Sequence, residues 1–184
     1  MRVVFTKGPG TSYRIAVHRE TGAALAPRNG PGGHPYLPHD LVHFLVEAEA
    51  GIELGVYGRL AAGDNGLFWP ADPAERAKAA RRRKSKPVKP SPRARQDMAR
   101  SEHLADIALR AWEVRRGHAR ELPAYLAADG IPAVVDRIIV AFDDHADRWH
   151  ATPVTGELTV TWPRSAGPAG LRARSASPSG VMGR

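Results

Sequence analysis

Residues 37–51 read LPHDLVHFLVEAEAG, and this stretch predicts the central helix of the fold. A proline is tolerated in the first turn of a helix, because the N–H group that it lacks would have no partner there. Asp40 lies in the same turn, where its charge complements the helix dipole, and Gly51 is a natural C-terminal stop. The apolar side chains cover one broad side of the helix: Leu41, Val42, Phe44, Leu45 and Val46. We therefore expect a helix over 38–50 that is buried along this side.

Apolar residues recur at spacings of three and four in two later segments, which predicts two further core helices. One covers 101–117 and the other covers 131–149. The second has the strongest periodic pattern in the sequence, and its apolar stripe consists of Ile131, Val134, Val135, Ile138, Ile139, Phe142, Ala146 and Trp149. Both helices are therefore expected to pack on the core.

Two shorter helices are predicted over 56–62 and 122–128, each followed by a glycine that can end it. Gly55 and Gly58 flank Tyr57 in the first of them. Because glycine has no Cβ, this arrangement indicates close packing against a neighbouring element.

Strands are predicted at both ends of the sequence, where apolar and polar residues alternate. Every second residue of 12–19 is apolar, and a shorter version of the pattern precedes it at 3–5. A glycine turn then leads into a third extended segment at 23–26, and 157–162 predicts a last strand. The sequence thus predicts an α+β fold, in which a small antiparallel sheet (N-terminal meander plus one C-terminal strand) packs against four or five helices.

A disordered insertion and a disordered tail are expected around one folded domain. Residues 72–99 are basic and rich in proline. A basic helix is expected to start this insertion and to end near residue 84, before a solvated linker in which prolines force extended backbone. Residues 164–184 are rich in Ser, Pro, Gly and Ala, a composition that cannot bury a core. We therefore predict a single domain over 1–163 that the insertion interrupts.

The formal net charge of +8 is concentrated in the insertion and the tail. Residues 76–95 contain ten basic side chains and no acidic one. The densest basic run consists of Arg81, Arg82, Arg83 and Lys84. Such a run attracts nucleic acid or an acidic protein through charge alone, although no aromatic residue between 71 and 101 offers a platform for base stacking. The alternative interpretation is a solvated linker in an arginine-biased sequence.

Composition excludes several classes of protein. No run approaches the roughly 18 apolar residues that span a bilayer, so no membrane partner is expected. The first residues lack the long apolar stretch and cleavage site of a signal peptide, which predicts a cytoplasmic location. Because the sequence has no cysteine, disulfides are excluded and any metal site must use His, Asp, Glu or water.

His39, His43 and Glu47 lie four residues apart within the predicted central helix. Residues at this spacing share one helix face, and neighbours on it can hold a single ion. Imidazole and carboxylate are ligands of divalent Zn, Mn and Fe, while Asp40 could orient a ligand or act as an acid or base. Further ligands would come from elsewhere, with these candidates: Glu53, Asp143, Asp144 and His145. The alternative is that the three residues form the solvated side of an amphipathic helix.

Two resemblances involve the same residues. The segment 37–63, LPHDLVHFLVEAEAGIELGVYGRLAAG, resembles an uncharacterised family of small proteins from GC-rich bacteria, and no activity of that family is known to us. The His-Asp-x-x-His pattern of His39, Asp40 and His43 also resembles the zinc motif of a ubiquinone-biosynthesis family. That resemblance implies a bound zinc ion in a mostly helical fold.

The sequence departs from the second family at two positions. In the family, eleven residues separate the second histidine from a glutamate, and the position of that glutamate is Gly55 in this sequence. Its Gly-Glu-Leu-Ala motif corresponds to 58–61 here, with Arg59 in place of the glutamate. If zinc binds in the same way, Glu47 or Glu53 would have to replace the missing carboxylate.

The leading hypothesis is a divalent-metal-binding protein with His39, His43 and Glu47 as ligands and Asp40 as a supporting or catalytic group. Whether it is an enzyme stays open, and the sequence identifies no substrate. The alternative is a non-enzymatic interaction module whose basic insertion binds nucleic acid or an acidic partner.

Overall fold

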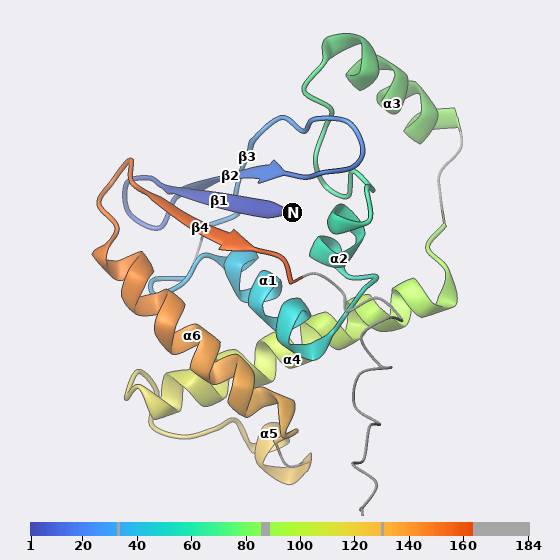
Figure 1. Cartoon of the computed structure of the whole chain (residues 1–184). Helices are drawn as coiled ribbons and strands as arrows, with labels where there is room; N and C mark the ends of the chain where they lie inside the picture. Colours follow the sequence, from blue (N-terminus) through green and yellow to red (C-terminus); the bar gives the residue numbers. More distant parts are fainter. Residues whose placement is uncertain (33, 86–88, 130, 164–184) are drawn as a thin grey trace, which may run out of the picture.

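The computed structural model describes residues 1–32, 34–85, 89–129 and 131–163, and it confirms the α+β class (Figure 1). The strands are β1 (Arg2–Lys7), β2 (Tyr13–His18), β3 (Arg28–Asn29) and β4 (Glu157–Thr161). The helices are α1 (His39–Ala50), α2 (Val56–Ala61), α3 (Pro73–Ser85), α4 (Pro92–Arg115), α5 (Ala124–Asp129) and α6 (Val134–Ala151). The described part of the chain thus contains six helices, and its strands form one antiparallel sheet in the order β3-β2-β1-β4.

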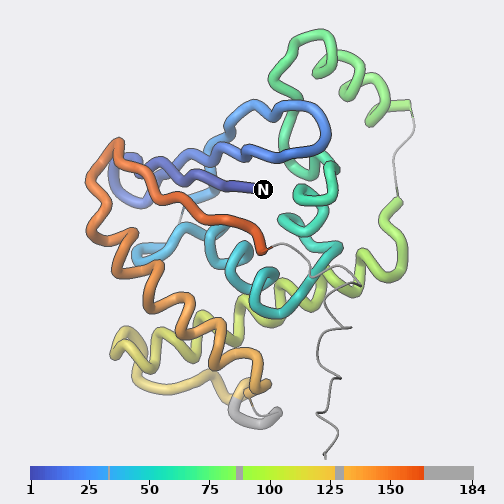
Figure 2. Tube along the Cα trace, viewed as in Figure 1, coloured from blue at the N-terminus to red at the C-terminus, as the bar shows by residue number. Residues whose placement is uncertain are grey.

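The sheet joins the two ends of the folded chain. β1 pairs with β2 on one edge and with β4 on the other, so Val3 lies between Val17 and Val160. Figure 2 shows the first and last strands side by side. Because side chains alternate across a strand, these residues and their neighbours two positions away form one apolar face. The predicted C-terminal strand that completes the sheet is confirmed.

The third strand lies later in the chain than the sequence predicts. Residues 23–26 do not pair with β2; Leu25 instead bridges Pro70. β3 pairs with β2 five residues further on, because the chain passes closely over the ring of Tyr13. A Cβ at Gly30 would lie 2.0 Å from that ring. Only glycine permits this approach, and the sequence pattern did not reveal it.

α1 lies beneath the sheet, and both α4 and α6 pack against α1 (Figure 1). The ring of Phe44 lies 5.1 Å from that of Tyr57 on α2 and 5.4 Å from that of Trp162 after β4, measured between centroids. Lys7 at the end of β1 donates hydrogen bonds to the carbonyl oxygens of Trp149 (2.8 Å) and Thr152 (2.9 Å). A cation at the C-terminus of α6 is favourable, because it satisfies carbonyl groups that the helix leaves free.

Much of the predicted disordered insertion is helical, which corrects the expectation for 72–99. The expected basic helix is α3, and α4 begins at Pro92 rather than at residue 101. Ser91 is the N-cap of α4, and its side chain accepts a hydrogen bond from the N–H of Ala94 (3.1 Å). Pro92 occupies the first turn, where a proline starts a helix instead of preventing it. Residues 86–88 and the predicted tail, 164–184, lie outside the described residues.

α3 has no buried residue, and arginine side chains connect it to the loop 66–70. The guanidinium of Arg83 lies 4.1 Å from the ring centroid of Trp69 and donates to the carbonyl oxygen of Gly66 (2.9 Å). Arg76 donates to the carbonyl oxygen of Pro70 (3.1 Å). The helix stands away from the core in Figure 1. None of the helices in the described part of the chain is long and apolar enough to cross a membrane.

We expect Arg83→Ala to loosen α3 without unfolding the domain. A short helix without packing is marginal in water, and a cation–π contact contributes on the order of 0.5–1 kcal/mol at an exposed site. Hydrogen exchange of the amides of 73–85 should accelerate several-fold, while exchange in α1 and α6 stays unchanged. Arg82→Ala is the control, because among the described residues the Arg82 side chain forms no hydrogen bond or ion pair, and only the Arg82 carbonyl oxygen accepts a bond, from Ser85 (3.5 Å). Equal rates of amide exchange in the two variants would contradict the proposal that Arg83 holds α3 in place.

Candidate functional site

The N-terminal half of α1 borders a cleft of about 480 Å³. Its polar lining consists of Arg28, Asn29, His39, Asp40, His43 and Glu102. Its apolar lining includes Val56, Tyr57, Leu67 and Met98. Four segments that are distant in sequence thus meet here: β3, α1, the region of α2 with the following loop, and α4.

His43 is a buried side chain of this cleft that a hydrogen bond connects to α4. It is only 7% exposed, and its Nδ1 atom lies 3.2 Å from the hydroxyl oxygen of Ser101 on α4. The Ser101 hydroxyl donates to Oε1 of Glu47 (3.2 Å). Because a hydroxyl has a single proton, Ser101 must accept at Nδ1 when it donates to the Glu47 carboxylate. This hydrogen-bonded chain assigns the proton to Nδ1 and leaves the Nε2 lone pair of His43 free.

The Nε2 atom of His43 lies 3.7 Å from Oε2 of Glu102. Burial lowers the pKa of His43, which favours the neutral ring, while the nearby Glu102 carboxylate acts in the opposite direction. The rings of His39 and His43 are 4.7 Å apart and nearly perpendicular. The structure therefore brings the two predicted histidines together and adds Glu102.

Glu47 is fully buried, and the first residues of α2 donate hydrogen bonds to it. Its carboxylate accepts hydrogen bonds from the N–H groups of Val56 (2.8 Å), Tyr57 (2.8 Å) and Gly58 (3.2 Å). A carboxylate is favourable at the N-terminus of a helix, where N–H groups have no intrahelical partner. Burial raises the pKa of Glu47, and these hydrogen bonds partly offset that effect.

The position of Glu47 changes the predicted ligand set. Its oxygens already accept hydrogen bonds from the N–H groups and from Ser101, and this leaves Glu47 poorly placed to act as a metal ligand. The alternative interpretation, that His39, His43 and Glu47 form the solvated side of the helix, is wrong for His43 and Glu47, because both are buried. Only His39 of the three is exposed.

The glycines around Tyr57 have the predicted role of allowing close packing. A Cβ at Gly55 would lie 2.3 Å from the carboxyl carbon of Glu47, and one at Gly58 would lie 2.3 Å from the carbonyl oxygen of Glu53. Gly55, which occupies the position of the glutamate in the ubiquinone-biosynthesis motif, thus lies directly against the Glu47 carboxylate.

Asp40 connects α1 to the sheet. Its carboxylate accepts a hydrogen bond from the hydroxyl of Tyr13 (2.7 Å) and forms an ion pair with Arg28. The same hydroxyl accepts from the Asp40 N–H (3.1 Å), and burial raises the pKa of Tyr13. These partners give Asp40 a structural role at the edge of the cleft, and we assign no reaction to it.

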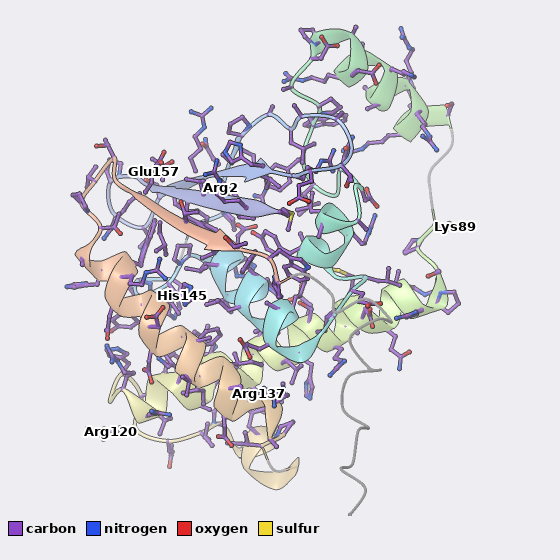
Figure 3. The ribbon with its side chains drawn as sticks, in the orientation of Figure 1. Arg2, Lys89, Arg120, Arg137, His145 and Glu157 are labelled. Carbon is purple, nitrogen blue, oxygen red and sulfur yellow. The ribbon has the colours of Figure 1, made fainter. Side chains whose placement is uncertain are left out.

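The other candidate ligands have partners outside the cleft. Glu53 pairs with Arg93, and Asp144 with Arg148. Asp143 accepts from the indole N–H of Trp112 (3.0 Å). His145 projects from α6, with its Nδ1 2.8 Å from the carbonyl oxygen of Ala141 (Figure 3).

Sequence reasoning missed Ser101 and Glu102, which lie on α4 more than fifty positions after His43. No spacing pattern connects residues so far apart. Among the described residues, no three His, Asp or Glu side chains stand ready to hold a metal ion in the present side-chain conformations.

No family model matches the chain, and no curated protein or solved structure matches it significantly. The two resemblances of the segment 37–63 therefore stay predictions.

Replacing Glu47 with Gln should destabilise the protein by about 1–3 kcal/mol, because the amide N–H₂ would face buried donors and leave at least one unsatisfied. The free energy of unfolding from urea titration measures this loss. Glu49→Gln on the same helix is the control, since Glu49 is partly exposed and its ion pair with Arg137 is long, at 3.7 Å. That change should cost less than about 1 kcal/mol. Similar losses in both variants would contradict the role assigned to Glu47.

Proposed function

We propose that the protein binds a divalent transition-metal ion, Zn²⁺, Mn²⁺ or Fe²⁺, in the cleft between α1 and α4. His39 and His43 supply imidazole nitrogens, and Glu102 supplies the carboxylate that the sequence hypothesis assigned to Glu47. The observation that carries the proposal is the hydrogen-bonded chain from Glu47 through Ser101 to His43.

Metal-binding histidines generally donate their second ring N–H to a fixed oxygen, which sets the tautomer and the ring orientation. Ser101 is that oxygen for His43, and Glu47 in turn holds the Ser101 hydroxyl. The Nε2 atom of His43 is then unprotonated, and an unprotonated imidazole nitrogen is the atom that coordinates a metal ion. Burial lowers the pKa of His43, which favours the neutral ring that a metal ion requires.

The other two ligands can complete the site by rotation of their side chains. His39 is exposed, and the Glu102 side chain is 64% exposed, so neither is held by packing. Exposed side chains change rotamer readily, whereas His43 cannot. Two histidines and one carboxylate also form the protein ligand set of many catalytic zinc sites, in which the fourth position is left for water or substrate.

We expect metal-free wild-type protein to take up close to one Zn²⁺ or Mn²⁺ per chain in calorimetric titration. His43→Ala should abolish this binding, and Glu102→Gln should weaken it at least tenfold. Ser101→Ala should weaken it by about 10–100-fold, as is typical for groups that orient a metal ligand. His103→Ala is the matched control, because it removes an exposed histidine of the same helix that does not line the cleft.

Circular dichroism of each variant separates loss of the site from loss of the fold. A wild-type protein that binds none of the three ions would refute the proposal. Unchanged affinity in folded His43→Ala would do the same.

A second candidate function is nucleic-acid binding by α3. No residue of the helix is buried, and Arg81, Arg82 and Lys84 have no ion pair among the described residues. Arg83 contacts Trp69 and therefore contributes mainly to the position of the helix. Unpaired cations on one helix attract a phosphate backbone without reading its sequence.

Fluorescence anisotropy with a labelled duplex at several salt concentrations tests this candidate. The triple variant Arg81→Ala/Arg82→Ala/Lys84→Ala should reduce the salt slope of log K by about 2–3, because each neutralised phosphate contributes about 0.9. The control removes equal charge from arginines that already pair with carboxylates: Arg115, Arg137 and Arg148. Binding to polyglutamate but not to the duplex would identify an acidic protein as the partner instead.

A further inference from the structure

A second hollow of about 360 Å³ continues the cleft along the first turns of α4. It is lined by Val56, Arg59, Gly66, Leu67, Pro90, Ala94, Arg95 and Met98. Val56, Leu67 and Met98 also line the cleft at His43, so the two hollows adjoin each other, and we refer to them together as the groove. Each has the size of a small-molecule site, for which about 300–1,000 Å³ is typical.

The middle of this groove is apolar and accessible. Leu67 is 64% exposed, and Val56 and Met98 are half-buried beside it. An exposed leucine next to a flexible methionine is a surface that an aliphatic chain can cover, and methionine adapts its shape to an irregular ligand. The aliphatic stems of the two arginines can extend this apolar lining.

The far end of the groove carries positive charge. Arg59 is paired with Asp64, but among the described residues the Arg95 side chain donates only to the carbonyl oxygen of Pro90 (2.7 Å). A guanidinium without a carboxylate partner is matched by an anionic group on the ligand. The groove therefore combines an apolar floor with one unneutralised cation at its end.

We propose that this groove binds an aliphatic carboxylic acid. The carboxylate pairs with Arg95, and the chain lies over Leu67, Val56 and Met98. The other end of the chain then reaches the cleft at His43. Only this last placement rests on the proposed metal site, because the contacts with Arg95 and the apolar floor do not involve the metal ligands.

The test is calorimetric titration of metal-free protein with decanoate. We expect decanol, which has the same chain without the charge, to bind at least tenfold more weakly, and decyltrimethylammonium to bind not at all. Absence of decanoate binding would overturn the proposal. Equal affinity for decanol would overturn the assigned role of Arg95.

Two matched pairs of variants locate the ligand. Leu67→Glu should weaken decanoate binding at least tenfold, whereas Val140→Glu on α6, with a similar exposure of 61%, should not change it. Arg95→Ala should weaken it about tenfold, whereas Arg93→Ala, which removes a partner of Glu53, should not. Equal effects within either pair would contradict the assigned position.

Separate titrations of the wild-type protein with decanoate and with Zn²⁺ distinguish this inference from the metal proposal. The decanoate titration uses metal-free buffer, so a failure to bind metal leaves its result unaffected. If the groove exists without the metal site, decanoate binds and Zn²⁺ does not. If the metal site exists without the groove function, Zn²⁺ binds and decanoate does not.

Discussion

The buried carboxylate of Glu47 is the interaction on which the arrangement around the cleft depends. A charge without solvent must be satisfied by hydrogen bonds, and Glu47 receives them from three N–H groups of α2 and from Ser101 of α4. One side chain of α1 therefore positions two other helices. The absence of a side chain at Gly55 is part of the same constraint, because any Cβ there would displace the carboxylate.

The chemistry proposed for the cleft follows from this constraint. Ser101 can orient His43 only because Glu47 holds the serine hydroxyl in place. At the N-terminal end of α1, Asp40 and Tyr13 connect the same helix to the sheet. His43 thus projects from a helix that is fixed at both of these points, while His39 and Glu102 remain free to adjust. A rigid central group between mobile partners is suited to capturing an ion or a small ligand.

The charged groups of the basic helix α3 differ from Glu47 and Asp40 at the cleft, because none of them is buried. The cations of α3 are outside the core, and Arg83 and Arg76 attach the helix through a ring and carbonyl oxygens. The groove that we assign to a carboxylic acid lies between the loop after α2 and the start of α4, where Arg95 is located. Positive charge therefore contributes to two separate proposals, and different residues carry each of them.

The sequence by itself determined the α+β class, the pairing of its end segments in one sheet, and helices near 38–50, 56–62 and 131–149. These features follow from local periodicity, which the spacing of apolar residues records directly. It also placed His39 and His43 on one helix face, because their separation is four residues.

Only the tertiary structure decided what those side chains contact. Periodicity placed Glu47 on the polar side of its helix but could not show that α2 buries it. It also could not connect His43 to Ser101 across more than fifty residues. The position of β3 and the early start of α4 were missed for related reasons. The first depends on a close approach to Tyr13, and the second depends on a serine cap that makes a proline compatible with a helix. Long-range contacts and backbone packing are three-dimensional properties, and a one-dimensional pattern does not contain them.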